Sequence, residues 1–186
     1  SGSAVTESYN GSSWTEVNDL STARRILAQS GSYTASVAFG GGFPAKDETE
    51  SWNGTSWTEV NDLNTAKSFI GGSGTQTAGL AIGGPGTNAE TESWNRTSWT
   101  EVNDLNTGRQ VYSTANFTQT SSLVAGGSPP ATAKTESWNG TSWTETTDLN
   151  TARAHLGLTG ADNTSALAFG GEPGSGTVAL TESWNG

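Results

Sequence analysis

Apolar and polar residues alternate along this chain in runs of four or five positions, and turn-forming residues separate the runs. Residues 36–39 end at Gly40-Gly41, and residues 49–52 and 56–60 flank Asn53-Gly54. Alternation of this kind is typical of half-buried strands, and Asn-Gly between two such runs is the strongest short signal for a β-hairpin. The pattern therefore predicts short antiparallel strands.

The same pattern returns every 42 to 46 residues. Thr-Glu-Ser, an aromatic residue and Asn occur together five times, beginning at Thr6, Thr49, Thr91, Thr135 and Thr181. A period of this length indicates a repeat architecture, in which each unit packs against its neighbours because it cannot bury its apolar faces alone. We expect four strands in each unit, named a, b, c and d in chain order, with Thr-Glu-Ser in strand c.

The c–d hairpin predicts how neighbouring units pack. With Asn53-Gly54 as a two-residue loop, Trp52 would lie opposite Thr55 and Glu50 would lie opposite Trp57. Large side chains would then share one face of the sheet, and small hydroxyl side chains would share the other. Stacking identical sheets would place Trp against Ser and Thr, and each Trp could bury about 150–250 Å². The tryptophans expected to form this structural core are Trp14, Trp52, Trp57, Trp94, Trp99, Trp138, Trp143 and Trp184.

Double glycines precede these aromatic residues at regular places. Gly40-Gly41, Gly83-Gly84 and Gly126-Gly127 each precede two tryptophans, and Gly170-Gly171 precedes Trp184. A basic residue follows each c–d pair, at Arg24, Lys67, Arg109 and Arg153. This combination resembles the kelch motif, which implies an all-β fold: a β-propeller of four-stranded antiparallel blades, with four blade equivalents per chain. The repeats are also similar to those of predicted structural proteins of marine bacteriophages, which implies a virion or adhesion role.

The repeats also predict the domain boundaries. We expect residues 1–3 to be a cloning remnant and residues 4–186 to form a single propeller domain. The expected blades cover about 24–63, 67–105, 109–149, and 153–186 completed by 6–20. Strand c occurs five times and the other strands four times, so one copy of strand c is surplus. Two closures stay open: a monomer closed by its own termini, or a homodimer that completes a larger ring.

Composition narrows the functional classes. The chain of 186 residues has a formal net charge of −10 and spreads eight basic residues thinly, so it lacks the basic stripe that binds nucleic acid. No apolar run approaches the about 20 residues of a membrane span. The absence of Cys excludes a disulfide framework and a thiolate metal site. We expect no cofactor, no metal, no nucleic-acid partner and no membrane partner, with a virion or extracellular location preferred.

The repeats differ most in the loops between strands b and c, which cover 42–48, 85–90, 128–134 and 172–180. In a propeller these loops share a face with the d–a loops, and loops on a rigid scaffold commonly carry binding residues. The candidate ligand-binding residues on this face are Phe43, Lys46, Asn88, Lys134, Glu172 and Val178. Neutral variation of exposed loops is the alternative explanation.

Polar residues that are copied from repeat to repeat give little support for catalysis. His155 is the single His and is expected to be a packing variant, so no Ser-His-Asp set can be assembled. Four aspartates each precede a basic residue by five positions and are expected to pair with it: Asp19, Asp62, Asp104 and Asp148. We therefore expect a non-catalytic module that recognises a protein or glycan through loops. The alternative is a self-assembling or engineered repeat scaffold without a ligand.

Overall fold

The structure is a computed structural model and describes residues 2–114 and 118–186. Over these residues the chain forms 16 strands and no helix, so the fold is all-β. Accordingly, no helix in these two ranges is long and apolar enough to cross a membrane.

The described strands form five antiparallel sheets. One four-stranded sheet contains β3 (Ala28–Ser32), β4 (Ala35–Phe39), β5 (Thr49–Trp52) and β6 (Trp57–Val60). The other contains β7 (Gly71–Thr75), β8 (Ala78–Ile82), β9 (Thr91–Trp94) and β10 (Trp99–Val102). Two three-stranded sheets contain β11 (Ser122–Ala125), β12 (Thr135–Trp138) and β13 (Trp143–Glu145), and β14 (Gly157–Asp162), β15 (Ser165–Phe169) and β16 (Thr181–Trp184). The N-terminal hairpin contains β1 (Glu7–Tyr9) and β2 (Trp14–Glu16).

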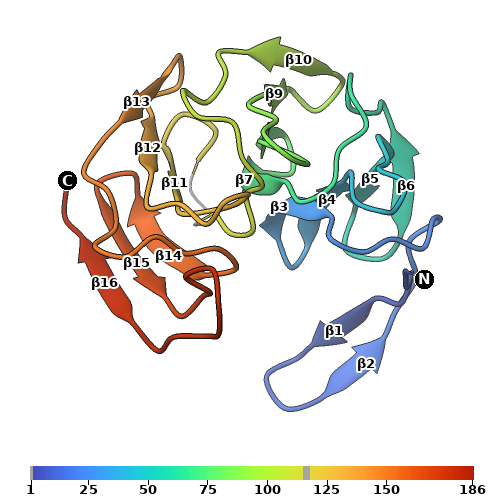
Figure 1. Cartoon of the computed structure of the whole chain (residues 1–186). Coiled ribbons are helices and arrows are strands. Elements are labelled where there is room, and N and C mark those ends of the chain that lie inside the picture. The colour runs from blue at the N-terminus through green and yellow to red at the C-terminus, as the bar shows by residue number, and fades with distance from the viewer. Residues whose placement is uncertain (1, 115–117) are drawn as a thin grey trace.

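The sheets follow one another around an arc in chain order (Figure 1). Hairpin β1–β2 lies at one end of the arc and sheet β14–β16 lies at the other (Figure 1). The predicted Thr-Glu-Ser strands are confirmed, since they form β5, β9, β12 and β16 and most of β1. The repeat in the sequence is therefore a repeat of sheets.

The loop of the c–d hairpin is longer than predicted. Trp52 pairs with Trp57 and Glu50 pairs with Glu59, which leaves four residues in the loop of this hairpin instead of two. The side chain of Asn53 explains the wider loop, because its Oδ1 accepts the backbone N–H groups of both Thr55 and Ser56 at 2.9 Å. The predicted faces are nevertheless correct, because an error of two residues keeps every side chain on its side of the sheet.

The predicted contact between indole and hydroxyl faces is confirmed at three junctions between sheets. Trp99 Nε1 donates to Thr49 Oγ1 at 3.1 Å, and Trp143 Nε1 donates to Thr91 Oγ1 at 3.0 Å. Trp57 Nε1 donates in the same way to Thr6 Oγ1 at 3.1 Å. These three strand-d tryptophans thus lie against strand c of the preceding sheet or hairpin, and the direction is the same at all three junctions.

The tryptophans form much of the core, with one exception. Five are buried, namely Trp52, Trp94, Trp99, Trp138 and Trp143, and Trp57 and Trp184 are half-buried. Trp14 is 66% exposed, so the expectation that it belongs to the packed core is wrong. The reason lies in the arrangement of the sheets, because hairpin β1–β2 ends the arc and no other sheet of the described residues covers its outer side (Figure 1).

Buried ion pairs join the basic residue of each repeat to the Glu of Thr-Glu-Ser. Arg24 pairs with Glu50 at 2.9 Å, and Arg109 pairs with Glu136 at 2.5 Å. The equivalent pairs in the other repeats are Lys67–Glu92 at 2.8 Å and Arg153–Glu182 at 2.6 Å. Because these charges are removed from water, losing one partner would leave the other as an uncompensated buried charge and would destabilise the fold.

The expected pairing of these basic residues with aspartates is wrong. Asp62 Oδ1 instead accepts the backbone N–H of Thr49 at 3.0 Å, at the start of strand c. The other aspartates do the same: Asp19 with Thr6, Asp104 with Thr91 and Asp148 with Thr135. The repeat places Glu, on the bulky face of strand c, nearer to the basic side chain than Asp.

The expected completion of 153–186 by 6–20 is not formed within the chain. In the described residues, β2 pairs with β1 alone and β16 pairs with β15 alone. The hairpin is held by the adjacent sheet instead, through the Trp57 bond and through Asn18 Nδ2, which donates to Thr55 O at 3.0 Å. Ser3, expected to lie outside the fold, pairs with Arg24 through two backbone hydrogen bonds.

Candidate functional site

Backbone hydrogen bonds bring the b–c and d–a loops together at one end of the sheets. Gly41 N–H donates to Lys67 O at 2.7 Å, and Gly127 N–H donates to Arg153 O at 2.9 Å. These glycines have positive φ angles of 95° and 122°, which residues with a side chain rarely adopt. Gly84 donates in the same way to Arg109 O, so three of the double glycines tie the loop of one repeat to the start of the next. We call this end of the sheets the loop face.

Four aromatic rings from four repeats form a row on the loop face. Phe43 contacts Phe69 with ring centroids 5.4 Å apart, and Phe69 contacts Tyr112 at 5.8 Å, both edge to face. Tyr112 then lies 3.9 Å from the ring of His155. We call these four residues the aromatic row.

Charged groups lie at the two ends of the aromatic row. The guanidinium carbon of Arg25 lies 5.1 Å from the centroid of the Phe43 ring, within the range of a cation–π contact. At the other end, Nδ1 of His155 lies 3.3 Å from Glu172 Oε2. The Tyr112 hydroxyl hydrogen-bonds with Gln110 and Ser128.

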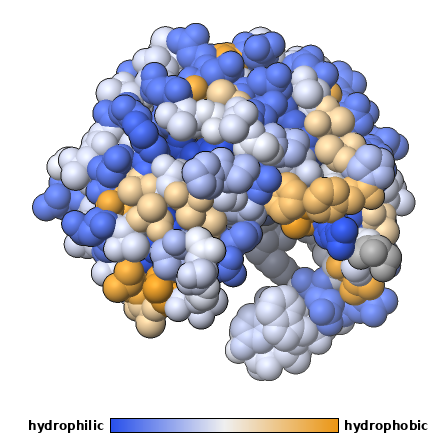
Figure 2. Space-filling model, viewed as in Figure 1, coloured by the Kyte–Doolittle hydropathy of each residue, from blue (hydrophilic) through white to orange (hydrophobic). Residues whose placement is uncertain are grey.

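The aromatic row is accessible to a ligand. Phe43 is 61% exposed, the His155 side chain is 48% exposed, and Phe69 and Tyr112 are half-buried. Phe69 and His155 adopt positive φ angles of 56° and 53°, which are unusual for residues with bulky side chains. The side of the molecule shown in Figure 2 is largely hydrophilic, with separate hydrophobic patches.

Two of the six candidate ligand-binding residues lie at the row. Phe43 is its first ring, and Glu172 contacts its last ring. Lys46 lies apart in an ion pair with Glu48 at 2.7 Å. Burial raises the pKa of Glu48, but hydrogen bonds from Lys46 and from the backbone, together with the charges of Lys46 and Arg24, outweigh burial, so the pKa lies below the ordinary value of 4.5.

The other three candidates are not brought together with the row. Lys134 pairs with Glu145, which raises the Lys134 pKa. Asn88 Oδ1 accepts the backbone N–H of Glu90 at 2.9 Å and so shapes its own loop. Val178 donates its backbone N–H to Gly171 O at 3.0 Å.

Sequence reasoning missed Arg25, Phe69 and Tyr112 and assigned His155 to packing. These residues follow the basic residue of each repeat by one to three positions, where the four repeats differ strongly in side chain. That difference was a usable signal, since positions that vary on an otherwise copied framework are candidates for recognition.

In residues 2–114 and 118–186 no group of three or more His, Asp or Glu side chains is arranged to hold a metal ion. Comparison with protein-family models and with curated proteins found no match to this chain.

Proposed function

We propose that this chain is a non-catalytic β-propeller module of the kelch-like type that binds a protein or a glycan through its loop face. In this proposal the four repeats are four blade equivalents, and the aromatic row is the contact surface. The observation that carries the proposal is the row itself, in which four repeats each place a ring at one accessible surface.

The chemistry of the row fits ligands with flat apolar surfaces and polar edges. Exposed aromatic faces stack on sugar rings and on aromatic or apolar side chains, at a low cost in side-chain entropy. Arg25 at one end and Glu172 at the other would select a ligand with complementary polar groups at its two ends. The resemblance to phage structural repeats adds a virion or adhesion setting to this proposal.

A glycan array and a pull-down with the purified chain test the proposal. We expect binding in one of the two assays, and we expect Tyr112→Ala to weaken that binding at least tenfold, as hot-spot aromatic residues do. Tyr33→Ala is the matched control, because Tyr33 is 68% exposed and lies outside the row. Silence of the wild-type chain in both assays would favour the repeat scaffold without a ligand.

A further inference from the structure

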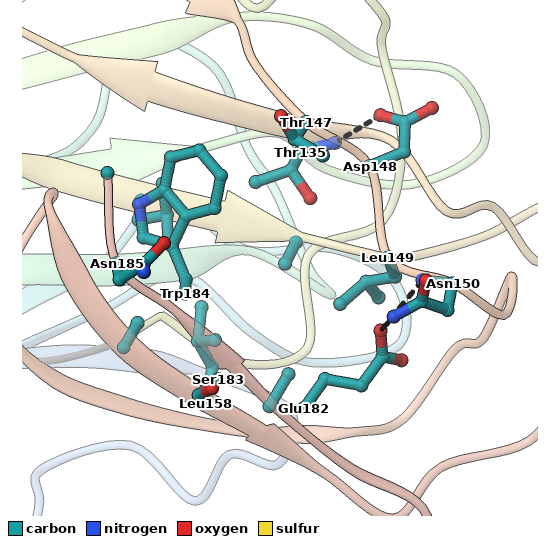
Figure 3. Close-up of a pocket in the computed structure, with 15 residues that line it drawn as sticks. Thr135, Thr147, Asp148, Leu149, Asn150, Leu158, Glu182, Ser183, Trp184 and Asn185 are labelled. Atoms are coloured by element: carbon teal, nitrogen blue, oxygen red, sulfur yellow. Dashed lines mark hydrogen bonds between the residues drawn. The ribbon is translucent and has the colours of Figure 1, made fainter.

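Among the described residues, no strand pairs with β16 as β6 pairs with β5 and β10 with β9, and a cavity of about 240 Å³ lies beside sheet β14–β16. Its walls include Thr135 from β12, Leu149 and Asn150 from the following loop, and Trp184 from β16 (Figure 3). Ala166 of β15 also lines it. We call this space the terminal cavity.

Four of the residues that line the cavity have counterparts around a buried tryptophan in the preceding repeat. Trp143 donates to Thr91 Oγ1 and lies 5.3 Å from the ring of Trp138. Leu105 belongs to the same hydrophobic cluster, and Asn106 Nδ2 donates to Trp143 O at 3.1 Å. Thr135, Trp184, Leu149 and Asn150 occupy these same four positions one repeat later. The terminal cavity is thus the site of a strand-d indole.

The same comparison holds one repeat earlier. Trp99 donates to Thr49 Oγ1, lies 5.2 Å from the ring of Trp94, and accepts Asn64 Nδ2 at its backbone oxygen at 3.2 Å. Two repeats therefore surround this indole with the same set of groups.

Trp14 is the strand-d tryptophan that lacks such surroundings. It is 66% exposed, whereas Trp99 and Trp143 are each 5% exposed. Exposing an indole of about 150–250 Å² to water is unfavourable, so an equivalent apolar site is its preferred location.

We propose that Trp14 of a second copy of this chain occupies the terminal cavity. Its indole N–H donates to Thr135 Oγ1, and its backbone carbonyl accepts Asn150 Nδ2. Strand β2 of that copy becomes the fourth strand beside β14 and β15. The third strand is β16 or the incoming β1, since both carry Thr-Glu-Ser, an aromatic residue and Asn.

A second copy is the favoured source because the chain's own hairpin is already placed. The hairpin is bonded to the adjacent sheet through Thr6 and Asn18, and Ser21 N–H donates to Glu50 Oε2 at 2.7 Å. In the arc of Figure 1 the hairpin lies at one end, and sheet β14–β16, which lines the cavity, lies at the other. When the incoming β1 stays paired with β2, a second copy reaches the cavity without changing any of the three junctions.

One departure in the last repeat makes this contact weaker than the internal ones. Asn61 and Asn103 donate to the c–d loop of the following sheet, at 2.8 Å to Thr97 O and 3.0 Å to Thr141 O. Thr147 stands at the equivalent position beside the terminal cavity. The missing carboxamide removes one hydrogen bond, so the affinity of this contact is lower, and its occupancy varies with the concentration of the chain. The inference is independent of ligand binding at the loop face.

Light scattering and sedimentation of the full-length chain test the proposal. We expect the wild-type mass to exceed that of one chain and Trp14→Ala to have the mass of one chain with an unchanged far-UV spectrum. Trp14→Phe should restore part of the association, and Thr135→Val should weaken it about fivefold because one hydrogen bond is lost. Tyr33→Ala is the control, because Tyr33 is 68% exposed but lies outside both the terminal cavity and the aromatic row.

A mixing experiment identifies the source of the indole. Ala166→Phe fills the terminal cavity but keeps Trp14, and Trp14→Ala keeps the cavity but removes the indole. We expect each variant alone to remain a single chain and an equimolar mixture to form heterodimers through the one intact contact.

Three outcomes would overturn the proposal. The first is a wild-type chain that stays single at every concentration while Trp14 is buried, which would mean closure by its own hairpin. The second is association that Trp14→Ala leaves unchanged. The third is a mixture of the two variants that shows no complex.

Discussion

At the scale of single residues, equivalent side chains contact equivalent partners in successive repeats. The contacts of a residue in one repeat therefore predict those of its counterpart in the next. The buried charges illustrate this regularity, since each basic residue meets the Glu of strand c in its own repeat. Burial removes the solvent that would otherwise stabilise a lone charge. Replacing one partner of a buried pair should therefore lower the free energy of unfolding by more than replacing one partner of an exposed pair.

Replacing Arg109 with Met should lower the free energy of unfolding by about 3–5 kcal/mol, because Glu136 keeps an uncompensated buried charge. Urea unfolding followed by tryptophan fluorescence measures this loss. Lys134→Met is the matched control and should leave the urea midpoint nearly unchanged, since Lys134 and Glu145 are both exposed. Equal effects of the two variants would contradict a structural role for the buried pair.

Glu182 predicts a dependence of stability on pH. Burial raises its pKa, but hydrogen bonds from Asn150 and the charge of Arg153 outweigh burial, so the folded pKa lies below the ordinary value of 4.5. The ionised form is favoured by folding, so its contribution is present above about pH 4.5 and is lost as the pH falls through the folded pKa.

We therefore expect Glu182→Gln to lower stability at about pH 7, with a difference from wild type that shrinks toward about pH 3. Urea midpoints measured across this range test the expectation. A difference that grows on acidification would show that the assigned sign is wrong.

At the scale of elements, the strands and their faces could be predicted from alternation and from Asn-Gly, but the loop length could not. The Asn53 side chain accepts two backbone N–H groups and so stabilises a loop of four residues. The alternation of apolar and polar residues is the same for a loop of two or of four residues, so it could not predict the loop length. The partner of each basic residue was missed for a similar reason. Asp19 lies five positions before Arg24, whereas Glu50 lies 26 positions after it, and the pairing of the strands decides which carboxylate meets the buried charge.

At Gly126, which follows strand b of its repeat, the backbone conformation and the surroundings both disfavour a side chain. Gly126 has a φ of 67°, and a Cβ there would overlap Leu156 and lie 2.5 Å from Arg153 O. Gly86 has the same φ of 67° but no atom within 4 Å of such a Cβ. Comparing Gly126 with Gly86 therefore separates the effect of backbone strain from the effect of crowding by neighbouring atoms.

We expect Gly126→Ala to destabilise the protein by about 1–3 kcal/mol more than Gly86→Ala, since only the first overpacks a junction. Thermal unfolding of the two variants provides the comparison. Similar losses would indicate that backbone conformation alone selects these glycines.

At the scale of the whole molecule, each sheet depends on a neighbour, so the two ends of the arc differ from its middle. The candidate binding surface follows from this arrangement, since the aromatic row exists only where several repeats meet. Sequence reasoning located the loop face and Phe43. It could not foresee which variable side chains meet, because that depends on distances between repeats.

Amide hydrogen exchange of the Trp14→Ala variant should show a gradient along the arc. We expect strong protection in β8 and β9, which lie inside a four-stranded sheet, and weak protection in β1 and β2. A two-stranded hairpin is marginally stable in water, which is the physical reason. Uniform protection of all five sheets would contradict this picture.

The exposure of Trp14 gives the protein an intrinsic optical reporter. Among its eight tryptophans, this indole is the one that stands mostly in water, and five others are buried. A small anionic or neutral quencher would reach it first, and its emission would lie at longer wavelength than that of the enclosed indoles. The surroundings of the N-terminal hairpin can therefore be followed in real time without attaching a dye.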